Sequence, residues 1–308
     1  MRKSILKYLP PELTRELCGN QAFDEAEELR IRAEKRVMFY ARGREYILDY
    51  IPTMQTVRKL IFAFSEHSVT AFFEELKQGF FTVGKGVRIG VAGRIVSENG
   101  TVKMIRDYSS VNIRFPREFI GISRPLLAYT QQDGRMLSTL IVSAPQHGKT
   151  TLLRDMIRAA SEGDGYLPQK CAVVDERSEI SGGLCFDLGL RTDVLLGCPK
   201  AEGMSMALRS LSPQVIATDE IGGERDLESI FEAAVSGVKI LATAHASSFE
   251  ELMQRDHYAQ LFQRGVIQRV ILLSESMGRG TVEQICDSCG KRLLSSPLSI
   301  RAEETVVG

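Results

Sequence analysis

VSAPQHGKTTLLRDMI, residues 142–157, has the form of a phosphate-binding loop that runs directly into a helix. The usual pattern is G-x-x-x-x-G-K-[ST]. Gly148, Lys149 and Thr150 fit it, and Ser143 stands where its first glycine belongs. Serine is small and costs little there if its φ stays negative. Because an apolar segment precedes the loop and a helical pattern follows it, we interpret the stretch as a true phosphate loop rather than a chance match.

The residues of this loop have separate expected roles. Gly148 lets the backbone approach the phosphates, Lys149 balances the charge of the β- and γ-phosphates, and the Thr150 hydroxyl ligates magnesium. His147 occupies a free position of the pattern and needs no catalytic role. We expect the whole loop to bind the nucleotide: Ser143, Ala144, Pro145, Gln146, His147, Gly148, Lys149, Thr150 and Thr151.

The residues around the loop predict an α/β domain. Short apolar segments are separated by amphipathic helices: STLIVSA (138–144), KCAVVDE (170–176), QVIATDE (214–220), VKILATAH (238–245) and RVILLSE (269–275). Near-continuous apolar runs are typical of strands that are buried on both faces of a parallel sheet. Repeated β-α units therefore predict a doubly wound domain over residues 136–295.

Residues 1–118 have a different pattern. The segments 37–48, 79–96 and 102–115 alternate in polarity, which indicates antiparallel strands, and 11–20 and 69–80 resemble helices. This predicts a smaller α+β domain at residues 1–118. We expect a linker over 119–135 and a loose tail over 296–308.

Composition limits the function classes. Of 308 residues, 44% are hydrophobic and 25% charged, which is a globular balance. Lys+Arg and Asp+Glu both number 39, so the chain lacks the global basic field of a dedicated nucleic-acid coat. No apolar run approaches membrane-spanning length, so we expect a cytoplasmic protein. Cys286 and Cys289 form a lone C-x-x-C, and we expect no metal there.

A second strand end carries two acids. PQVIATDEIGG, residues 213–223, is an apolar segment that ends in Asp219 and Glu220, which is the Walker B form. We expect Asp219 to hold magnesium through water and Glu220 to orient and deprotonate the attacking water. An acidic pair after a strand is common on its own, and the alternative is a helix N-cap. Together with the phosphate loop it is a strong signal.

Two more strand ends carry polar residues. KILATAHASS (239–248) places Thr243 and His245 where ligands bind in open α/β sheets, so His245 could sense the γ-phosphate; the alternative is a satisfied buried histidine. In VVDERSEI (173–180), Asp175 and Glu176 either polarise water or pair with Arg177. These residues alone leave both alternatives open.

ATP with Mg²⁺ is the expected ligand. Asn20, Asn99 and Asn112 are the asparagines of the chain, and none lies in an N-K-x-D motif that would recognise guanine. A small-molecule kinase is disfavoured because the Asp-Glu pair suits activation of water and no separate substrate motif is present.

In combination, these segments resemble the stage III sporulation protein AA family. The resemblance rests on residues 190–223, with VVDERSEI before them and GVKILATAHASSFEEL after them, and on 29–37, 79–96 and 109–123 in the first domain. That family is similar to the traffic ATPases of type II secretion and type IV pili. These are RecA-like hexamers on the cytoplasmic side of a membrane assembly. The resemblance implies a RecA-like P-loop domain and ATPase activity.

The resemblance also implies roles for single residues. VVDERSEI resembles the Asp box of those ATPases, which favours Glu176 as a second catalytic carboxylate, and TAHASS resembles their His box, centred on His245. Arginines of their N-terminal domain reach the nucleotide, and an arginine supplied in this way contributes on the order of 10³-fold or more. The candidates here are Arg88, Arg94 and Arg114; the alternatives are a solvated charged face or a contact with acidic lipid or a partner surface. Those ATPases usually have Gly-Glu in place of Asp219-Glu220.

We therefore expect a motor ATPase that energises a membrane channel complex during sporulation. The resemblance implies a homo-hexamer that is peripheral at the cytoplasmic face of the membrane, with an integral-membrane platform subunit as partner. We expect no specific nucleic acid, because the chain lacks Trp and has no basic motif interleaved with aromatic residues. Two alternatives stay open. RecA-like domains also drive nucleic-acid translocases, and Ser143 raises the possibility of a nucleotide-binding scaffold with little turnover.

Overall fold

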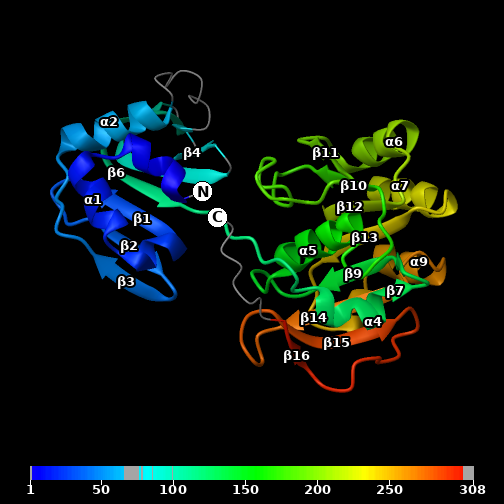
Figure 1. Ribbon diagram of the computed structural model, residues 1–308. Helices are drawn as coiled ribbons and strands as arrows, with labels where there is room; N and C mark the ends of the chain where they lie inside the picture. The colour runs from blue at the N-terminus through cyan, green and yellow to red at the C-terminus, as the bar shows by residue number, and fades with distance from the viewer. Residues whose placement is uncertain (1, 66–75, 78, 85, 99, 301–308) are drawn as a thin grey trace. The chain divides into compact units, whose positions relative to one another are not determined.

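The computed structural model describes residues 2–65, 76–77, 79–84, 86–98 and 100–300 (Figure 1). The chain divides into two compact units, one that ends at Arg117 and one that begins at Glu118. The helix expected within residues 69–80 falls largely outside the described residues.

The first unit is a six-stranded antiparallel sheet with short helices. Its strand order is β3-β2-β1-β6-β5-β4. The strands are β1 (Ala26–Arg32), β2 (Met38–Ala41), β3 (Arg44–Ile47), β4 (Phe80–Val83), β5 (Val87–Glu98) and β6 (Thr101–Arg114). The helices are η1 (Arg2–Tyr8), α1 (Pro11–Cys18), η2 (Gln21–Glu25) and α2 (Met54–Phe64). The smaller α+β domain that the alternating pattern predicted is confirmed.

Alternation along the strands builds the core of this unit. Leu29 and Ile31 of β1 are fully buried, and Arg30 and Arg32, which alternate with them, lie on the other face. Each such apolar side chain contributes about 1.5–3 kcal/mol when it leaves water.

The second unit is an eight-stranded sheet with the order β11-β10-β12-β13-β9-β14-β15-β16. Neighbours from β11 to β14 are parallel, and β15 and β16 are antiparallel. The five predicted strands are β9 (Thr139–Val142), β10 (Cys171–Asp175), β12 (Val215–Glu220), β13 (Lys239–Ala244) and β14 (Arg269–Ser274). Three others were not predicted as strands: β11 (Thr192–Leu196), β15 (Thr281–Asp287) and β16 (Leu298–Ser299). The α/β class is confirmed.

Helices cover both faces of this sheet (Figure 1). On one face, α5 (Lys149–Glu162) packs on alternate strand residues such as Ile141 and Val173. On the other face, α6 (Lys200–Ser210), α7 (Glu224–Val235) and α9 (Asp256–Gln263) pack on Leu140 and Val174, and α8 (Phe249–Met253) precedes α9. Burial on both faces explains the continuous apolar runs of the central strands.

Residues 119–135, for which we expected a linker, lie in the second unit. They contain η4 (Arg124–Leu126), α4 (Leu127–Thr130), β7 (Gln131–Gln132) and the first residue of β8 (Arg135–Met136). The carboxylate of Asp155 on α5 accepts hydrogen bonds from the backbone N–H groups of Gly121 (2.8 Å) and Ser123 (2.8 Å) and from Ser123 Oγ (2.6 Å). These bonds fasten the start of the second unit to α5.

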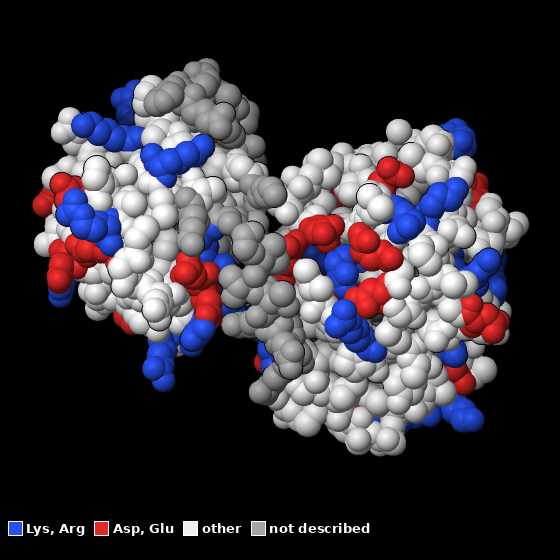
Figure 2. Space-filling model, viewed as in Figure 1, with Lys and Arg blue, Asp and Glu red and all other residues white. Residues whose placement is uncertain are grey.

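Charge is mixed over the surface. Figure 2 shows Lys and Arg side chains interspersed with Asp and Glu on the viewed face of each unit. None of the described helices combines the length and the apolar character that a bilayer crossing needs.

Candidate active site

The phosphate loop forms the turn between β9 and α5. Gly148 has φ +95°, and a Cβ built on it would meet nothing within 4 Å. Glycine is therefore required here by the backbone conformation and not by space. Ser143 is buried and is not among the residues with positive φ, so serine is compatible with its position.

The first turn of α5 offers unpaired donors. Gly148 is the N-cap and provides no side-chain hydrogen bond. Within the described residues, the backbone N–H groups of Lys149, Thr150 and Thr151 have no acceptor. Free N–H groups and the helix dipole make such a terminus attractive to anions. These donors, the Lys149 ammonium and the Thr150 hydroxyl suit phosphate and Mg²⁺.

Lys149 is the central cation of the loop. Its side chain is buried, and Nζ donates to the carbonyl oxygens of Ser143 (3.0 Å) and Ala144 (3.1 Å) and lies 3.0 Å from His245 Nδ1. Burial lowers the pKa of Lys149, and the negative charge of Glu220 opposes this shift.

A cavity of about 530 Å³ lies at the carboxyl ends of the central strands. The loop and α5 contribute Pro145, Gln146, Gly148, Lys149, Thr150, Thr151 and Leu153 to its lining. Ser143 and Ala144 contact the Lys149 ammonium instead, and His147 Nε2 lies 4.0 Å from Glu275. The other lining residues come from the ends of neighbouring strands: Asp219, Glu220, Thr243, His245, Arg177, Glu179 and Arg279.

His245 connects the phosphate loop with Glu220. Its Nε2 lies 3.6 Å from Glu220 Oε2, and both side chains are a little over one-third exposed. His245 Nδ1 also lies 3.3 Å from the carbonyl oxygen of Ser143, so its tautomer decides whether it accepts from the Lys149 ammonium or donates to that carbonyl. The imidazole ring therefore lies between the Lys149 ammonium and the Glu220 carboxylate.

Asp219 is paired with a cation that the sequence did not indicate. It is 7% exposed, and its Oδ1 lies 2.8 Å from the Nζ of Lys200, the first residue of α6. Burial raises the pKa of Asp219, and Lys200 opposes this shift.

The two acids of VVDERSEI have different environments. Asp175 is fully buried, and its carboxylate accepts from the backbone N–H groups of Glu179 (2.9 Å), Ile180 (3.1 Å) and Ser181 (2.8 Å), so it stabilises its own loop. Glu176 is not among the cavity-lining residues, and its Oε2 lies 3.5 Å from Lys200 Nζ. Among the described residues, no ion pair joins either acid to Arg177.

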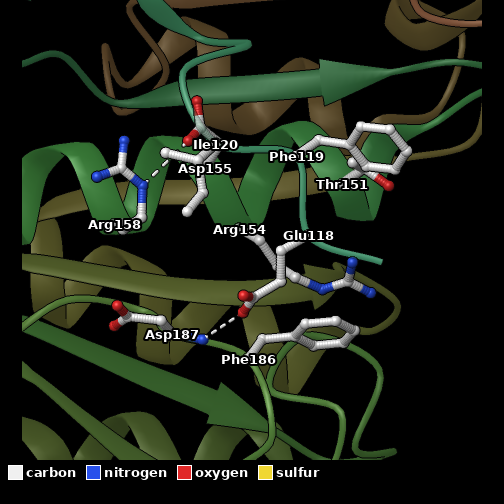
Figure 3. Close-up of a pocket in the computed structure, with 9 residues that line it drawn as sticks. All are labelled: Glu118, Phe119, Ile120, Thr151, Arg154, Asp155, Arg158, Phe186 and Asp187. Carbon is white, nitrogen blue, oxygen red and sulfur yellow. Dashed lines mark hydrogen bonds and ion pairs between the residues drawn. The ribbon is translucent and has the colours of Figure 1, made fainter. Parts of the chain in front are cut away.

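A small pocket beside α5 shows how this loop is held (Figure 3). The Arg154 guanidinium lies 4.0 Å from the centroid of the Phe186 ring, and the Glu118 carboxylate accepts from the Asp187 N–H (2.6 Å). Arg154 also donates to the carbonyl oxygen of Ile180 (2.7 Å). Burial lowers the pKa of Arg154 to about 10, although nearby acids oppose the shift. The helix that begins at the phosphate loop thus also holds the loop that follows β10.

The chain matches a known protein family over most of its length. A family model described as "Sporulation stage III, protein AA" matches residues 1–293. The chain belongs to this family. It is 42% identical over 296 residues to "Stage III sporulation protein AA" of Bacillus subtilis (strain 168), which covers 94% of this chain and 96% of that protein. The "Uncharacterized protein ycf45" of Cyanidium caldarium is 28% identical over 199 residues, or 63% of this chain and 57% of that protein.

Solved structures similar to this member of the sporulation stage III protein AA family include the pilus retraction motor PilT with bound ADP. The TM-score is 0.57 at 18% identity, over 85% of this chain and 76% of PilT. The Yersinia pseudotuberculosis ATPase DotB has a TM-score of 0.57 at 16% identity, over 95% of this chain and 80% of DotB. These similarities confirm the expected α/β P-loop fold.

The three candidate arginines belong to the first unit of this family member. Arg88 lies 3.6 Å from the centroid of the Phe80 ring, and Arg114 Nε lies 3.4 Å from Glu28 Oε2. Arg94 is exposed on β5. Their roles stay predictions.

The cations that line the cavity are Lys149, Arg177 and Arg279. Sequence reasoning missed Arg279, which lies between β14 and β15, and Glu179. A signal existed for Glu179, because VVDERSEI contains it, whereas nothing in the sequence around Arg279 indicated a site.

Proposed function

We propose that this member of the sporulation stage III protein AA family hydrolyses ATP with Mg²⁺ in the cavity at the carboxyl ends of β9, β12 and β13. One observation carries the proposal: the uncapped first turn of α5 and the Lys149 ammonium share this cavity with Glu220 and His245. Hydrogen-bond donors that can bind phosphate and a carboxylate that can activate water therefore line the same cavity.

Each residue has a task that its position supports. Lys149 and the first N–H groups of α5 hold the phosphates, and Thr150 and Asp219 hold Mg²⁺. Bound Mg²⁺ would supply charge neutralisation to the phosphates. Glu220 orients the attacking water and takes its proton. Nε2 of His245 faces Glu220 and Nδ1 faces Lys149, so His245 links the phosphate site to the base.

Glu179 is proposed as the second carboxylate in place of Glu176. It lines the cavity, and its backbone is fixed on both sides, because its N–H donates to Asp175 (2.9 Å) and its carbonyl oxygen accepts from Arg154 (3.0 Å). Glu176 is directed to Lys200 instead. We further propose that one of Arg88, Arg94 and Arg114 completes the site.

The biological role is proposed from the relatives. The Bacillus subtilis relative is named for stage III of sporulation, and PilT is named a pilus retraction motor. We therefore propose a cytoplasmic homo-hexamer that docks on an integral-membrane platform subunit and energises a channel complex. Light scattering of the purified chain with ATP and Mg²⁺ tests the hexamer, and a species that stays monomeric would contradict it.

Phosphate release tests the activity. Wild type should release phosphate from ATP, Glu220→Gln should lose at least about 100-fold in rate, and Lys149→Ala should lose ATP binding. Glu224→Gln is the matched control, because Glu224 is exposed at the start of α7 and outside the cavity lining. Equal background rates in wild type and Glu220→Gln, with ATP bound in both, would favour a scaffold. Strong stimulation by single-stranded DNA would favour a translocase.

A further inference from the structure

Lys200 is a buried cation that the proposed mechanism does not use. Its side chain is 8% exposed, and its Nζ lies 2.8 Å from Asp219 Oδ1 and 3.5 Å from Glu176 Oε2. Both acids were expected at the nucleotide site. The Lys200 ammonium therefore neutralises Asp219, which is proposed to hold Mg²⁺, and Glu176 also lies close to it.

The position of Lys200 is unfavourable without these partners. An ammonium that leaves water needs a close counter-charge. Lys200 is also the first residue of α6, where the positive end of the helix dipole repels a cation, and the N-cap Pro199 provides no side-chain acceptor. Asp219 is thus the main group that compensates the burial of Lys200.

Packing holds Lys200 in this place. Gly203, on the first turn of α6, lies so close to β10 that a Cβ built on it would approach Val174 Cγ1 to 2.5 Å. Ser229 Oγ of α7 donates to the carbonyl oxygen of Ala201 (3.3 Å). The start of α6 is therefore fixed against the sheet, and the Lys200 ammonium is kept beside Asp219.

Lys200 and a divalent cation would both bind the carboxylate of Asp219. The Asp219 side chain is only 9% exposed, and its Oδ1 is already in contact with the ammonium. A carboxylate that is neutralised by an ammonium attracts a second cation less, and the two cations repel each other at short range. Nucleotide phosphates would add the negative charge that shifts this balance toward the metal.

We propose that Lys200 is a positioning residue that competes with Mg²⁺ for Asp219. It weakens metal binding at the site until nucleotide phosphates are present, and so couples metal binding to nucleotide binding. This inference rests on the proposed function, because it takes Asp219 as a metal contact.

The test measures binding of Mn²⁺, as a probe for Mg²⁺, from the electron paramagnetic resonance signal of the free ion, with and without saturating ADP. Lys200→Gln removes the charge and keeps a donor for Asp219, so the fold is expected to survive. It should bind Mn²⁺ about tenfold tighter than wild type with ADP, and the gain should be larger without ADP. Lys200→Arg should behave like wild type because it keeps the charge.

Two further variants exclude a merely structural effect. In Lys200→Gln/Asp219→Asn, the affinity for Mn²⁺ should equal that of Asp219→Asn, because the competition acts only through Asp219. Lys239→Met is the matched control, since the Lys239 ammonium contacts Gln268 at the amino end of β13. It should leave Mn²⁺ binding unchanged.

The proposed competition is wrong if Lys200→Gln binds Mn²⁺ no more tightly than wild type. It is also wrong if Lys200→Gln raises the Mn²⁺ affinity by the same factor in the wild-type and the Asp219→Asn background. Binding of a fluorescent ADP analogue in EDTA separates the two proposals. If wild type binds no ADP, the proposed function fails; if every variant binds ADP and the Mn²⁺ affinities do not move, only the role of Lys200 fails.

Discussion

Replacement of Asp155 by asparagine should loosen the segment that begins the second unit. The Asp155 side chain is 1% exposed and accepts from Gly121 N–H, Ser123 N–H, Ser123 Oγ and Arg158 Nε. Asparagine keeps one acceptor oxygen and replaces the other with an NH₂ group. If the oxygen stays on Gly121, the Ser123 hydroxyl can turn to accept from the new NH₂ group, but the bond from the Ser123 N–H is lost and this N–H then faces a second donor.

The free-energy cost of Asp155→Asn follows from the hydrogen bonds that it removes. Each hydrogen bond to a charged group contributes about 1.5–3 kcal/mol, so the loss of the Ser123 N–H bond predicts about 1.5–3 kcal/mol of local destabilisation. Hydrogen exchange of the backbone amides of Gly121 and Ser123, followed by mass spectrometry, measures it directly. At about 3 kcal/mol, exchange in residues 119–127 should quicken by about 150-fold.

The matched control is Asp164→Asn. Asp164 pairs with Arg124 (3.2 Å) and Arg158 (2.9 Å), but it is partly exposed, so its loss should cost less than about 1 kcal/mol. If Asp155→Asn changes exchange at Gly121 and Ser123 by no more than this control, the reasoning from buried charged hydrogen bonds is refuted.

Three further predictions concern the phosphate loop, and titration of a fluorescent ATP analogue measures each. Gly148→Ala must force a residue with a Cβ to φ +95° and should weaken ATP binding at least about tenfold, whereas Gly223→Ala, at φ −146° with open space around it, should not. Ser143→Gly should leave ATP affinity within about twofold, and a large gain would show that serine impairs the loop. Because burial lowers the pKa of Lys149, its proton is lost at a lower pH than from a free lysine; ATP affinity should therefore begin to fall below the ordinary lysine pKa of about 10.4, and a profile that stays flat up to that pH would contradict this. Lys149→Arg should abolish that dependence because a guanidinium stays charged.

The central strands and the convergence at their ends were predictable from the sequence. Parallel strands that are buried on both faces leave continuous apolar runs, and their carboxyl ends must share one edge of the sheet. That rule alone brings Asp219, Glu220 and His245 beside the loop that contains Lys149, and the cavity contains all four.

What the sequence did not indicate depends on packing between distant segments. Lys200 lies beside Asp219 only because α6 packs closely on β10, and nothing in its local sequence marks a buried lysine. The choice between Glu176 and Glu179 depends on how the loop after β10 turns, which Asp175 and Arg154 fix through backbone hydrogen bonds. β11 was missed because its side chains are half-buried or exposed, so it carries no continuous apolar run.

The double attachment of α5 has a mechanical consequence. Its first turn faces the proposed phosphate site, and one turn later Asp155 holds the N–H groups of Gly121 and Ser123, just after the point where the chain enters the second unit. Thermodynamic linkage is reciprocal. If bound ATP lowers the equilibrium constant for opening of this segment by some factor, opening of the segment under tension must weaken ATP binding by the same factor. Mechanical tension on the segment around Gly121 and Ser123 would then favour release of the nucleotide.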